Sequence, residues 1–386
     1  MRFDGFGYAA LGLLVLAGSA QAGGFTRGTA DTDTLYEPGN FALRAGVTYV
    51  APTQEFTSAP TLAPNPGLVG SNYLDNYAIP SAAVKFGFND SLACAVTYTD
   101  AYGAASSHPV PYGPAGKLLE EFTIAEIGTT CAVFFDIGRG RLSVLGGGFI
   151  ESFDYEVESA TLSRLLPPPF PLVPVSTTAE LDSRAYGWRA GIGYEIPDIA
   201  FRAQLMYRSG TNHDGASGTA TITTPLGAGT FPAIGYGELP QMVELKLQSG
   251  IAPGWLAFGS VRWTDWSVNE TLTLTVPARG VTSVNEYYWR DGWTVTAGVG
   301  HAFNESVSGL VSIGWDQGVS TGYDLRGDRW TLAAGGSLKD KIGGELRFGA
   351  GISHLAAVDI TEGTNVGAAV DSGWAFAVTA GYSVRW

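Results

Sequence analysis

The sequence has few of the features that mark a soluble enzyme or a helical membrane protein. Charged residues make up only 15% of its 386 residues. Beyond residue 22, no stretch approaches the run of about 18 apolar residues that a membrane-spanning helix needs. Any segment that crosses a membrane must therefore be a β-strand, because only helices and closed barrels satisfy their backbone hydrogen bonds in lipid.

Positive charge and catalytic motifs are also scarce. Lys and Arg number 22 against 36 Asp and Glu, a formal charge of -14, so no basic patch is available to neutralise phosphates and we expect no nucleic-acid partner. The histidines are scattered without the spacing of a metal site, and the motifs of nucleophilic and phosphate-binding enzymes are missing. We expect no enzyme, no cofactor and no metal.

Cysteine occurs only twice, at Cys94 and Cys131. Both lie near the turn-side ends of neighbouring predicted strands. An oxidising compartment permits a disulfide there, and adjacent strands can satisfy its geometry if their register is right. The sequence leaves two alternatives open, a disulfide or two small buried thiols.

Glycine and aromatic residues are abundant. There are 53 glycines and 12% aromatics, yet the mean hydropathy is only +0.10. Strands that alternate apolar and polar side chains give such a value, because lumen-facing polar residues cancel the lipid-facing apolar ones.

The clearest alternation runs over residues 373–386. Apolar side chains fall on one face, at Trp374, Phe376, Val378, Ala380, Tyr382, Val384 and Trp386. This length suits a tilted transmembrane strand of about 9 to 11 residues. The ending Tyr382, Val384, Trp386 resembles the C-terminal signal by which outer-membrane barrels are recognised by their assembly machinery and closed.

The other end of the chain reads as a secretory signal, residues 1–22. Arg2 is followed by an apolar run too short to span a bilayer and by an Ala20-Gln21-Ala22 cleavage site. The mature chain should begin near Gly23.

Between the two ends, about fourteen strand candidates are joined alternately by tight turns and long connections. Asn89-Asp90 and Pro253-Gly254 are tight turns, and long connections are predicted near residues 104–119, 210–238 and 276–287. This alternation is typical of outer-membrane barrels. The predicted fold is all-β, a transmembrane antiparallel β-barrel of about 14 strands in the outer membrane of a Gram-negative-type cell.

Some predicted strands carry charges on one face. A Lys or Arg facing lipid at the midplane would cost roughly 2 to 4 kcal/mol, so these side chains must face the lumen. They are Glu244, Lys246, Arg262, Glu345 and Arg347. They are either paired wall residues that hold the barrel's shape or contacts that govern substrate binding and pore selectivity.

Several stretches in residues 200–386 resemble the outer-membrane long-chain fatty acid transporter family (FadL and TodX type). The most specific are Leu239-Pro240-Gln241, Trp263-Thr264-Asp265-Trp266-Ser267 and Trp289-Arg290-Asp291-Gly292-Trp293. The resemblance implies that an N-terminal hatch plugs the barrel and that cargo captured among extracellular loops leaves sideways, through a gap made by a kink in the third strand.

Carried onto this chain, the resemblance assigns residues 23–39 to a shortened hatch and 40–386 to the barrel. It makes Phe25 a substrate contact in the hatch. It places the lateral gate at Asp100, Ala101, Tyr102 and Gly103, where the glycine weakens the strand. The family's Asn-Pro-Ala is replaced here by Glu37-Pro38-Gly39.

The function predicted is passive uptake of long-chain fatty acids or other hydrophobic compounds across the outer membrane. The partners expected are these hydrophobic small molecules, outer-membrane lipid and lipopolysaccharide, and the barrel assembly machinery. Two alternatives remain at this point, a polar-lumen diffusion porin and a non-transporting surface barrel with adhesive loops.

Overall fold

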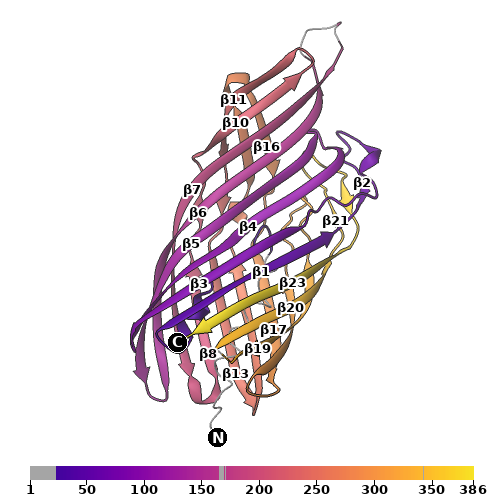
Figure 1. Cartoon of the computed structure of the whole chain (residues 1–386). Helices are drawn as coiled ribbons and strands as arrows, with labels where there is room; N and C mark the ends of the chain where they lie inside the picture. Colours follow the sequence, from indigo (N-terminus) through magenta and orange to yellow (C-terminus); the bar gives the residue numbers. More distant parts are fainter. Residues whose placement is uncertain (1–22, 165–168, 170, 342) are drawn as a thin grey trace.

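The computed structural model describes residues 23–164, 169, 171–341 and 343–386, so the predicted signal segment 1–22 lies outside the described residues. The chain forms a closed antiparallel barrel of fourteen strands, which confirms the predicted fold (Figure 1). The strands in chain order are β1 (Phe41–Thr53), β3 (Tyr77–Asn89), β4 (Leu92–Tyr112), β5 (Lys117–Ile137), β6 (Gly140–Ser163), β7 (Val173–Ile196), β8 (Phe201–Arg208), β13 (Met242–Ala252), β14 (Trp255–Thr264), β17 (Gly292–Ala302), β18 (Val307–Asp316), β19 (Arg329–Lys339), β20 (Gly344–Leu355) and β23 (Gly373–Arg385).

The barrel closes where the first strand meets the last. β1 pairs with β23 from Ala42 opposite Arg385 to Thr53 opposite Trp374. Trp386 stacks on Phe41 with ring centroids 4.6 Å apart. Closure leaves neither strand with an exposed edge, which removes the liability of unpaired backbone groups in lipid.

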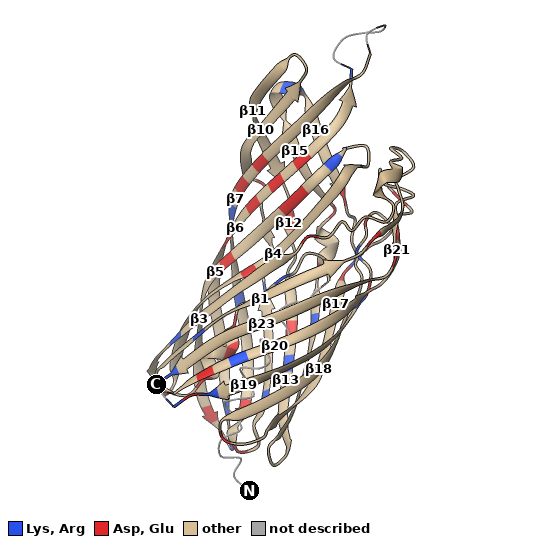
Figure 2. Cartoon of the chain, turned by 45° about the vertical axis from the view of Figure 1, so that its right-hand side comes forward, with Lys and Arg blue, Asp and Glu red and all other residues tan. Residues whose placement is uncertain are grey.

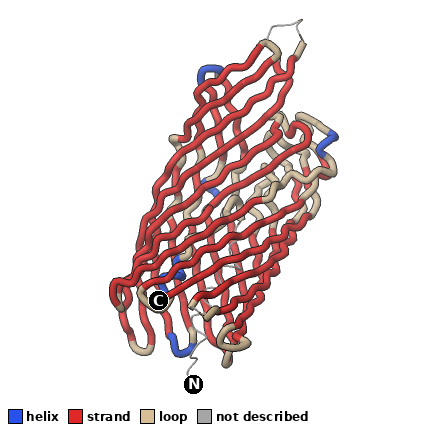
Figure 3. Tube along the Cα trace, viewed as in Figure 1, coloured by secondary structure: helices blue, strands red, loops and turns tan. Residues whose placement is uncertain are grey.

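The wall is much taller on one side than on the other. β4 to β7 are 21 to 24 residues long, whereas the other barrel strands have 8 to 13. Beyond the ring, β7 pairs with β10 (Ala216–Thr224), which continues through β11 (Gly227–Tyr236) and β15 (Thr271–Val276) to β16 (Val281–Glu286). Figure 3 shows this extension as continuous strand.

The long connection predicted at 104–119 was wrong, whereas 210–238 and 276–287 do lie between ring strands, β8 and β13 in one case and β14 and β17 in the other, but are themselves largely folded as strand. β4 and β5 leave only residues 113–116 between them, and β10, β11 and β16 occupy most of the other two segments. These strands extend the wall beyond the fourteen-strand ring. Acidic residues gather on the upper parts of β5, β6 and β7 (Figure 2), where Glu121 pairs with Glu156 and Glu156 with Glu180.

The remaining regular segments are short. One small sheet consists of β2 (Phe56–Ser58), β22 (Ala369–Val370) and β21 (Val358–Asp359). A second pairs β9 (Thr211–Asn212) with β12 (Glu238–Leu239). The helical turns are of the 3-10 type: η1 (Thr32–Tyr36), η2 (Pro66–Leu68), η3 (Pro197–Ile199), η4 (Trp266–Val268) and η5 (Pro277–Arg279). In the described part of the chain, no helix is long and apolar enough to cross a membrane.

The two cysteines lie directly opposite each other on β4 and β5. Cys94 pairs with Cys131 in the ladder, and a disulfide joins them. The bond links the third strand of the barrel to the fourth.

Candidate functional site

The ladder between β3 and β4 is interrupted. It ends where Ser81 pairs with Thr99. Just beyond, Ala101 is an extra residue of β4, because the register with β5 shifts between Asp100 and Tyr102. Such a bulge bends its strand and disrupts the ladder. We call the interval between the two strands beyond Ser81 and Thr99 the lateral gap.

The N-terminal segment, residues 23–30, fills the lateral gap with its own backbone. The amide of Arg27 donates to the carbonyl of Ala101 over 2.9 Å, and the amide of Gly103 donates to the carbonyl of Phe25 over 2.9 Å. The segment thus takes the place of a neighbouring strand. Its backbone forms hydrogen bonds with groups of β4 that do not pair with β3.

The fit between the segment and both sides of the gap is tight at Gly28. A Cβ atom there would lie 2.9 Å from the carbonyl oxygen of Asp100 on β4 and 3.2 Å from the side chain of Ile79 on β3. Above the gap, Leu74 and Ser106 form an isolated antiparallel bridge. The lateral gap is therefore bounded below by a ladder, above by a bridge and closed by the hatch.

Phe25 points from this segment into an aromatic pocket. Its ring centroid lies 4.6 Å from that of Trp289, 4.8 Å from Phe122, 5.3 Å from Tyr287 and 6.0 Å from Trp266. Three of these four contacts are edge-to-face, a favourable geometry for aromatic pairs. The side chain is only 7% exposed, so Phe25 is a core residue of this closed state.

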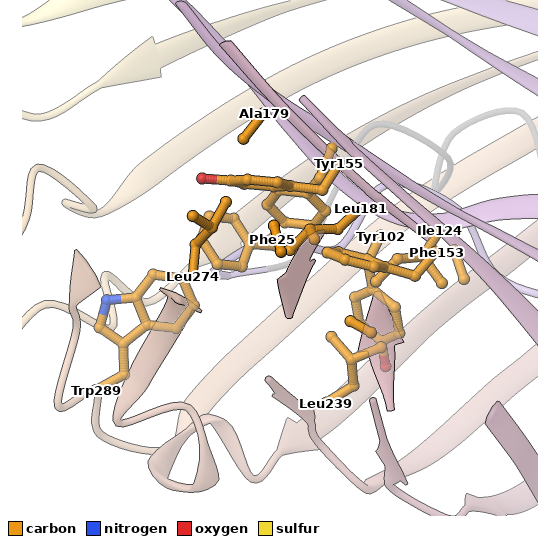
Figure 4. Packing of buried hydrophobic residues seen from close by; sticks show 14 of the residues in the cluster. Phe25, Tyr102, Ile124, Phe153, Tyr155, Ala179, Leu181, Leu239, Leu274 and Trp289 are labelled. Carbon is orange, nitrogen blue, oxygen red and sulfur yellow. The ribbon is translucent and has the colours of Figure 1, made fainter. Parts of the chain in front are cut away.

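The pocket belongs to a larger apolar cluster that reaches up the tall side of the wall. Figure 4 shows Phe25 close to Tyr155, Leu181 and Leu274, which come from β6, β7 and β15. The space left beside Phe25 amounts to about 30 Å³, whereas sites for small molecules usually measure about 300 to 1,000 Å³. The Phe25 ring therefore fills most of the apolar pocket.

The lower part of the hatch is held by ion pairs. Asp33, on η1, accepts from Arg202 of β8 over 2.7 Å and from Lys246 of β13 over 3.0 Å. Glu37 pairs with Arg44 of β1 and with Arg385 of β23, the latter at 3.0 Å. These strands lie on different sides of the ring, so the ion pairs hold the hatch across the lumen.

Contacts of the Tyr36 side chain complete this anchor. The hydroxyl of Tyr36 lies 2.7 Å from that of Ser143 on β6, and its ring packs edge-on against Phe134 of β5. The guanidinium of Arg202 lies 4.3 Å from the centroid of the Tyr36 ring. We use the name anchor for residues 31–37. The hatch therefore has two parts, a segment at the lateral gap and an anchor in the lumen.

The anchor carboxyls have strongly lowered pKa values. Burial alone would raise the pKa of Asp33, but Lys246 and Arg202 outweigh it and lower the pKa from 3.8 to about 2. For Glu37 burial is likewise outweighed, here chiefly by Arg44, and its pKa falls from 4.5 to about 2. Opposite charges close to a carboxyl favour its ionised form.

A pH dependence of closure follows from these shifts. Because the pKa values are lowered, the ion pairs contribute fully above about pH 4.5 and are lost as the pH falls through about 2. We expect the barrel to stay closed to ions in a planar bilayer from pH 8 to pH 4, with currents appearing between pH 3 and 2. Currents that rise already between pH 6 and 5 would contradict the anchor.

A second buried charge network lies behind Tyr102. Arg208 pairs with Glu126 at 2.8 Å and with Glu151, and it donates to the Tyr102 hydroxyl over 3.2 Å. Arg189 pairs with the other oxygen of Glu126. Tyr102 is only 1% exposed. This network holds the lumen side of the bulged segment against β5, β6 and β8.

Of the charges predicted for the lumen, Arg262, Glu345 and Arg347 are buried and Glu244 and Lys246 are half-buried, and all lie close to partners of opposite sign. Arg262 donates to Glu244 over 2.7 Å, Lys246 binds Asp33, and Arg347 lies 3.4 Å from Glu345. Asp33 and Glu37 were not predicted from the sequence, because the partners of Asp33 are 169 and 213 residues away and those of Glu37 include Arg385 at the far end of the chain as well as the nearby Arg44. A sequence feature that could have indicated them is the group of three carboxylates Asp31, Asp33 and Glu37, which lie within seven residues of a segment with few other charges.

Comparison with known protein families assigns the chain to one of them. A family model described as outer membrane protein transport protein (OMPP1/FadL/TodX) matches residues 39–308. The chain belongs to this family. The FadL/TodX family is one of outer-membrane transport channels, and the chain is an outer-membrane protein, as predicted.

Curated relatives in the FadL/TodX family are distant. A long-chain fatty acid transport protein of Escherichia coli O157:H7 is 22% identical over 388 residues, covering 91% of this chain and 86% of the relative. That of Escherichia coli O6:H1 is 26% identical, over 48% of this chain and 46% of its own. The match to this relative and to the one from Salmonella typhi thus spans about half of their length.

Solved structures of FadL/TodX proteins share the fold. A Pseudomonas aeruginosa FadL homologue superposes with a TM-score of 0.74 at 15% identity, covering 100% of this chain and 98% of that one. The Pseudomonas putida toluene transporter TodX gives a TM-score of 0.65 at 12% identity, covering 92% of both chains. At such identities the likeness shows the fold alone.

Proposed function

We propose that this protein is a passive channel for hydrophobic compounds, either long-chain fatty acids or hydrocarbons. The observation that carries the proposal is the aromatic pocket filled by Phe25, on the same segment that closes the lateral gap. The names of the relatives support the cargo class, because they specify transport of long-chain fatty acids and of toluene. An apolar pocket gains about 25 cal/mol per Å² of buried apolar surface, so capture of such a cargo is favourable.

The route that we propose is lateral. The anchor crosses the lumen with ion pairs to four strands, which disfavours passage along the barrel axis. Next to it lies a cavity of about 830 Å³, lined by residues 35–37 of the anchor and by the turn-side ends of the strands. Displacement of residues 23–30 would vacate the pocket and the lateral gap together. Asp100, Ala101, Tyr102 and Gly103 form one side of this gate.

The surroundings of the channel follow from the same proposal. Cargo that leaves through the lateral gap enters outer-membrane lipid, beneath the lipopolysaccharide in which the tall wall stands. Tyr382, Val384 and Trp386, on the strand that closes the barrel with β1, would be recognised by the barrel assembly machinery.

Uptake tests this proposal. In outer-membrane vesicles that carry the intact protein, we expect saturable uptake of radiolabelled oleate or toluene and no uptake of a small sugar. A variant that lacks residues 23–30 should lose saturation, because the pocket and the gap stay open. Uptake of the sugar without either hydrophobic compound would instead indicate the diffusion porin.

A further inference from the structure

Arg27 is buried in the lateral gap without a full set of partners. Its side chain is 4% exposed, and both Nε and Nη2 lack a hydrogen-bond partner. Nη1 donates to Thr123 over a long 3.3 Å. The guanidinium also lies 4.4 Å from the centroid of the Tyr77 ring. Buried arginines are normally satisfied by carboxylates, so two free donors at this place are unusual.

The chain makes room for this guanidinium at the lateral gap. A Cβ atom on Gly103 would lie 2.5 Å from Cζ and 2.6 Å from Nε of Arg27. Gly103 pairs with Thr123, and both belong to the outward face, because the inward residues are their neighbours Tyr102 and Phe122. Arg27 therefore lies in the path from the lumen to the lipid.

Nearby charges do not neutralise Arg27 fully. Burial is the largest effect on its guanidinium and lowers its pKa, and Tyr77, Glu121 and Asp100 offset this only in part. Within the described residues, no carboxylate forms an ion pair with Arg27 inside 4.0 Å. The site is thus deficient in negative charge and offers a planar pair of donors that suits a carboxylate.

We propose that Arg27 is the receptor for the carboxylate of a long-chain cargo. The inference rests on the proposed function and narrows its cargo from hydrophobic compounds in general to anionic amphiphiles. Phe25 is two residues away, about 7 Å along an extended chain, so the acyl chain takes the place of the Phe25 ring while the carboxylate binds Arg27. This pairing replaces the contacts with Tyr77 and Thr123 and so releases the segment from the lateral gap.

Binding of an acid and of its ester distinguishes this role from a structural one. The probes are 9,10-dibromostearate and its methyl ester, which quench Trp266 and Trp289 beside the pocket, titrated at pH 8 against purified protein. Arg27→Gln should weaken binding of the acid about tenfold or more, as expected for loss of a charge-assisted hydrogen bond. Binding of the ester should change less than twofold, and Arg27→Lys should retain most of the acid's affinity.

The control is Arg279→Gln, the same change at an exposed residue of η5, which should alter neither titration. Equal weakening of acid and ester by Arg27→Gln would show a purely structural role and overturn the inference, as would an unchanged affinity for the acid. If the wild-type protein binds neither probe, long-chain fatty acids are excluded as cargo and the inference fails with them, and if it also takes up no toluene the proposed function itself fails. If it binds the ester but shows no effect of Arg27, only the inference fails.

Discussion

Replacing Asp33 by Asn and Glu37 by Gln together should turn the closed barrel into an ion-conducting pore. The two changes leave Arg202 without its anchor carboxylate, and they remove one carboxylate each from Lys246 and Arg44, which keep Glu244 and Asp31. Removing one partner of a buried ion pair typically costs about 3 to 5 kcal/mol, because a charge is left unpaired. Water entering the lumen relieves this cost, and the anchor loses its hold.

Planar bilayers provide the measurement. The wild-type protein should show at most brief openings at pH 7, whereas the double variant should give large and steady currents. The cations that remain in the lumen should make this current anion-selective, because a charged lining concentrates counter-ions. A matched control is Asp198→Asn with Glu305→Gln, two exposed residues. A double variant as silent as the wild type would show that packing alone closes the axis.

Phe25→Ala should bind an apolar ligand more tightly than the wild type. In the closed state Phe25 fills the pocket, and only about 30 Å³ remains beside it. A ligand must therefore first displace a ring whose burial is worth about 3 to 5 kcal/mol by comparison with other Phe→Ala changes. In the wild type, the state with the ring displaced is rarely populated, and this low population weakens the apparent affinity. Removing the ring should therefore lower the apparent Kd about 10- to 100-fold.

The sign of this effect discriminates between two roles of Phe25. If the Phe25 ring competes with the ligand, truncating the ring makes ligand binding tighter. If the ring contacts the bound ligand, truncating it makes binding weaker. Quenching of tryptophan fluorescence by methyl 9,10-dibromostearate measures the difference, since Trp266 and Trp289 both contact Phe25. Phe303→Ala, at a side chain that is 66% exposed, is the matched control. Weaker binding by Phe25→Ala would contradict the closed pocket as described.

The two variants act on separate parts of the hatch. The anchor, residues 31–37, is held by charge, and the segment at the lateral gap is held by backbone hydrogen bonds and by the Phe25 ring. We therefore expect Phe25→Ala to leave the bilayer currents unchanged. This division allows cargo to move sideways while the axis stays closed to polar solutes.

Sequence alone was enough for the architecture of the membrane-spanning wall. The alternation from Trp374 to Trp386 reflects one face in lipid and one in the lumen, and β23 occupies this segment. Where the strands leave the membrane this signal fades, because neither face needs to be strongly apolar. β10, with Ala216, Gly218 and Ala220 among Ser and Thr, reads as a loop for this reason.

The contacts within the candidate site, unlike the wall of the barrel, were decided by the tertiary structure. Resemblance to the family indicated Phe25 and residues 100–103, but it gave no partner for either. Asp33 and Arg202 are 169 residues apart, and Arg27 and Thr123 are 96 apart. Period-2 alternation tells which face a side chain is on and says nothing about what lies across the lumen. Only closure of the barrel around the hatch brings these groups together.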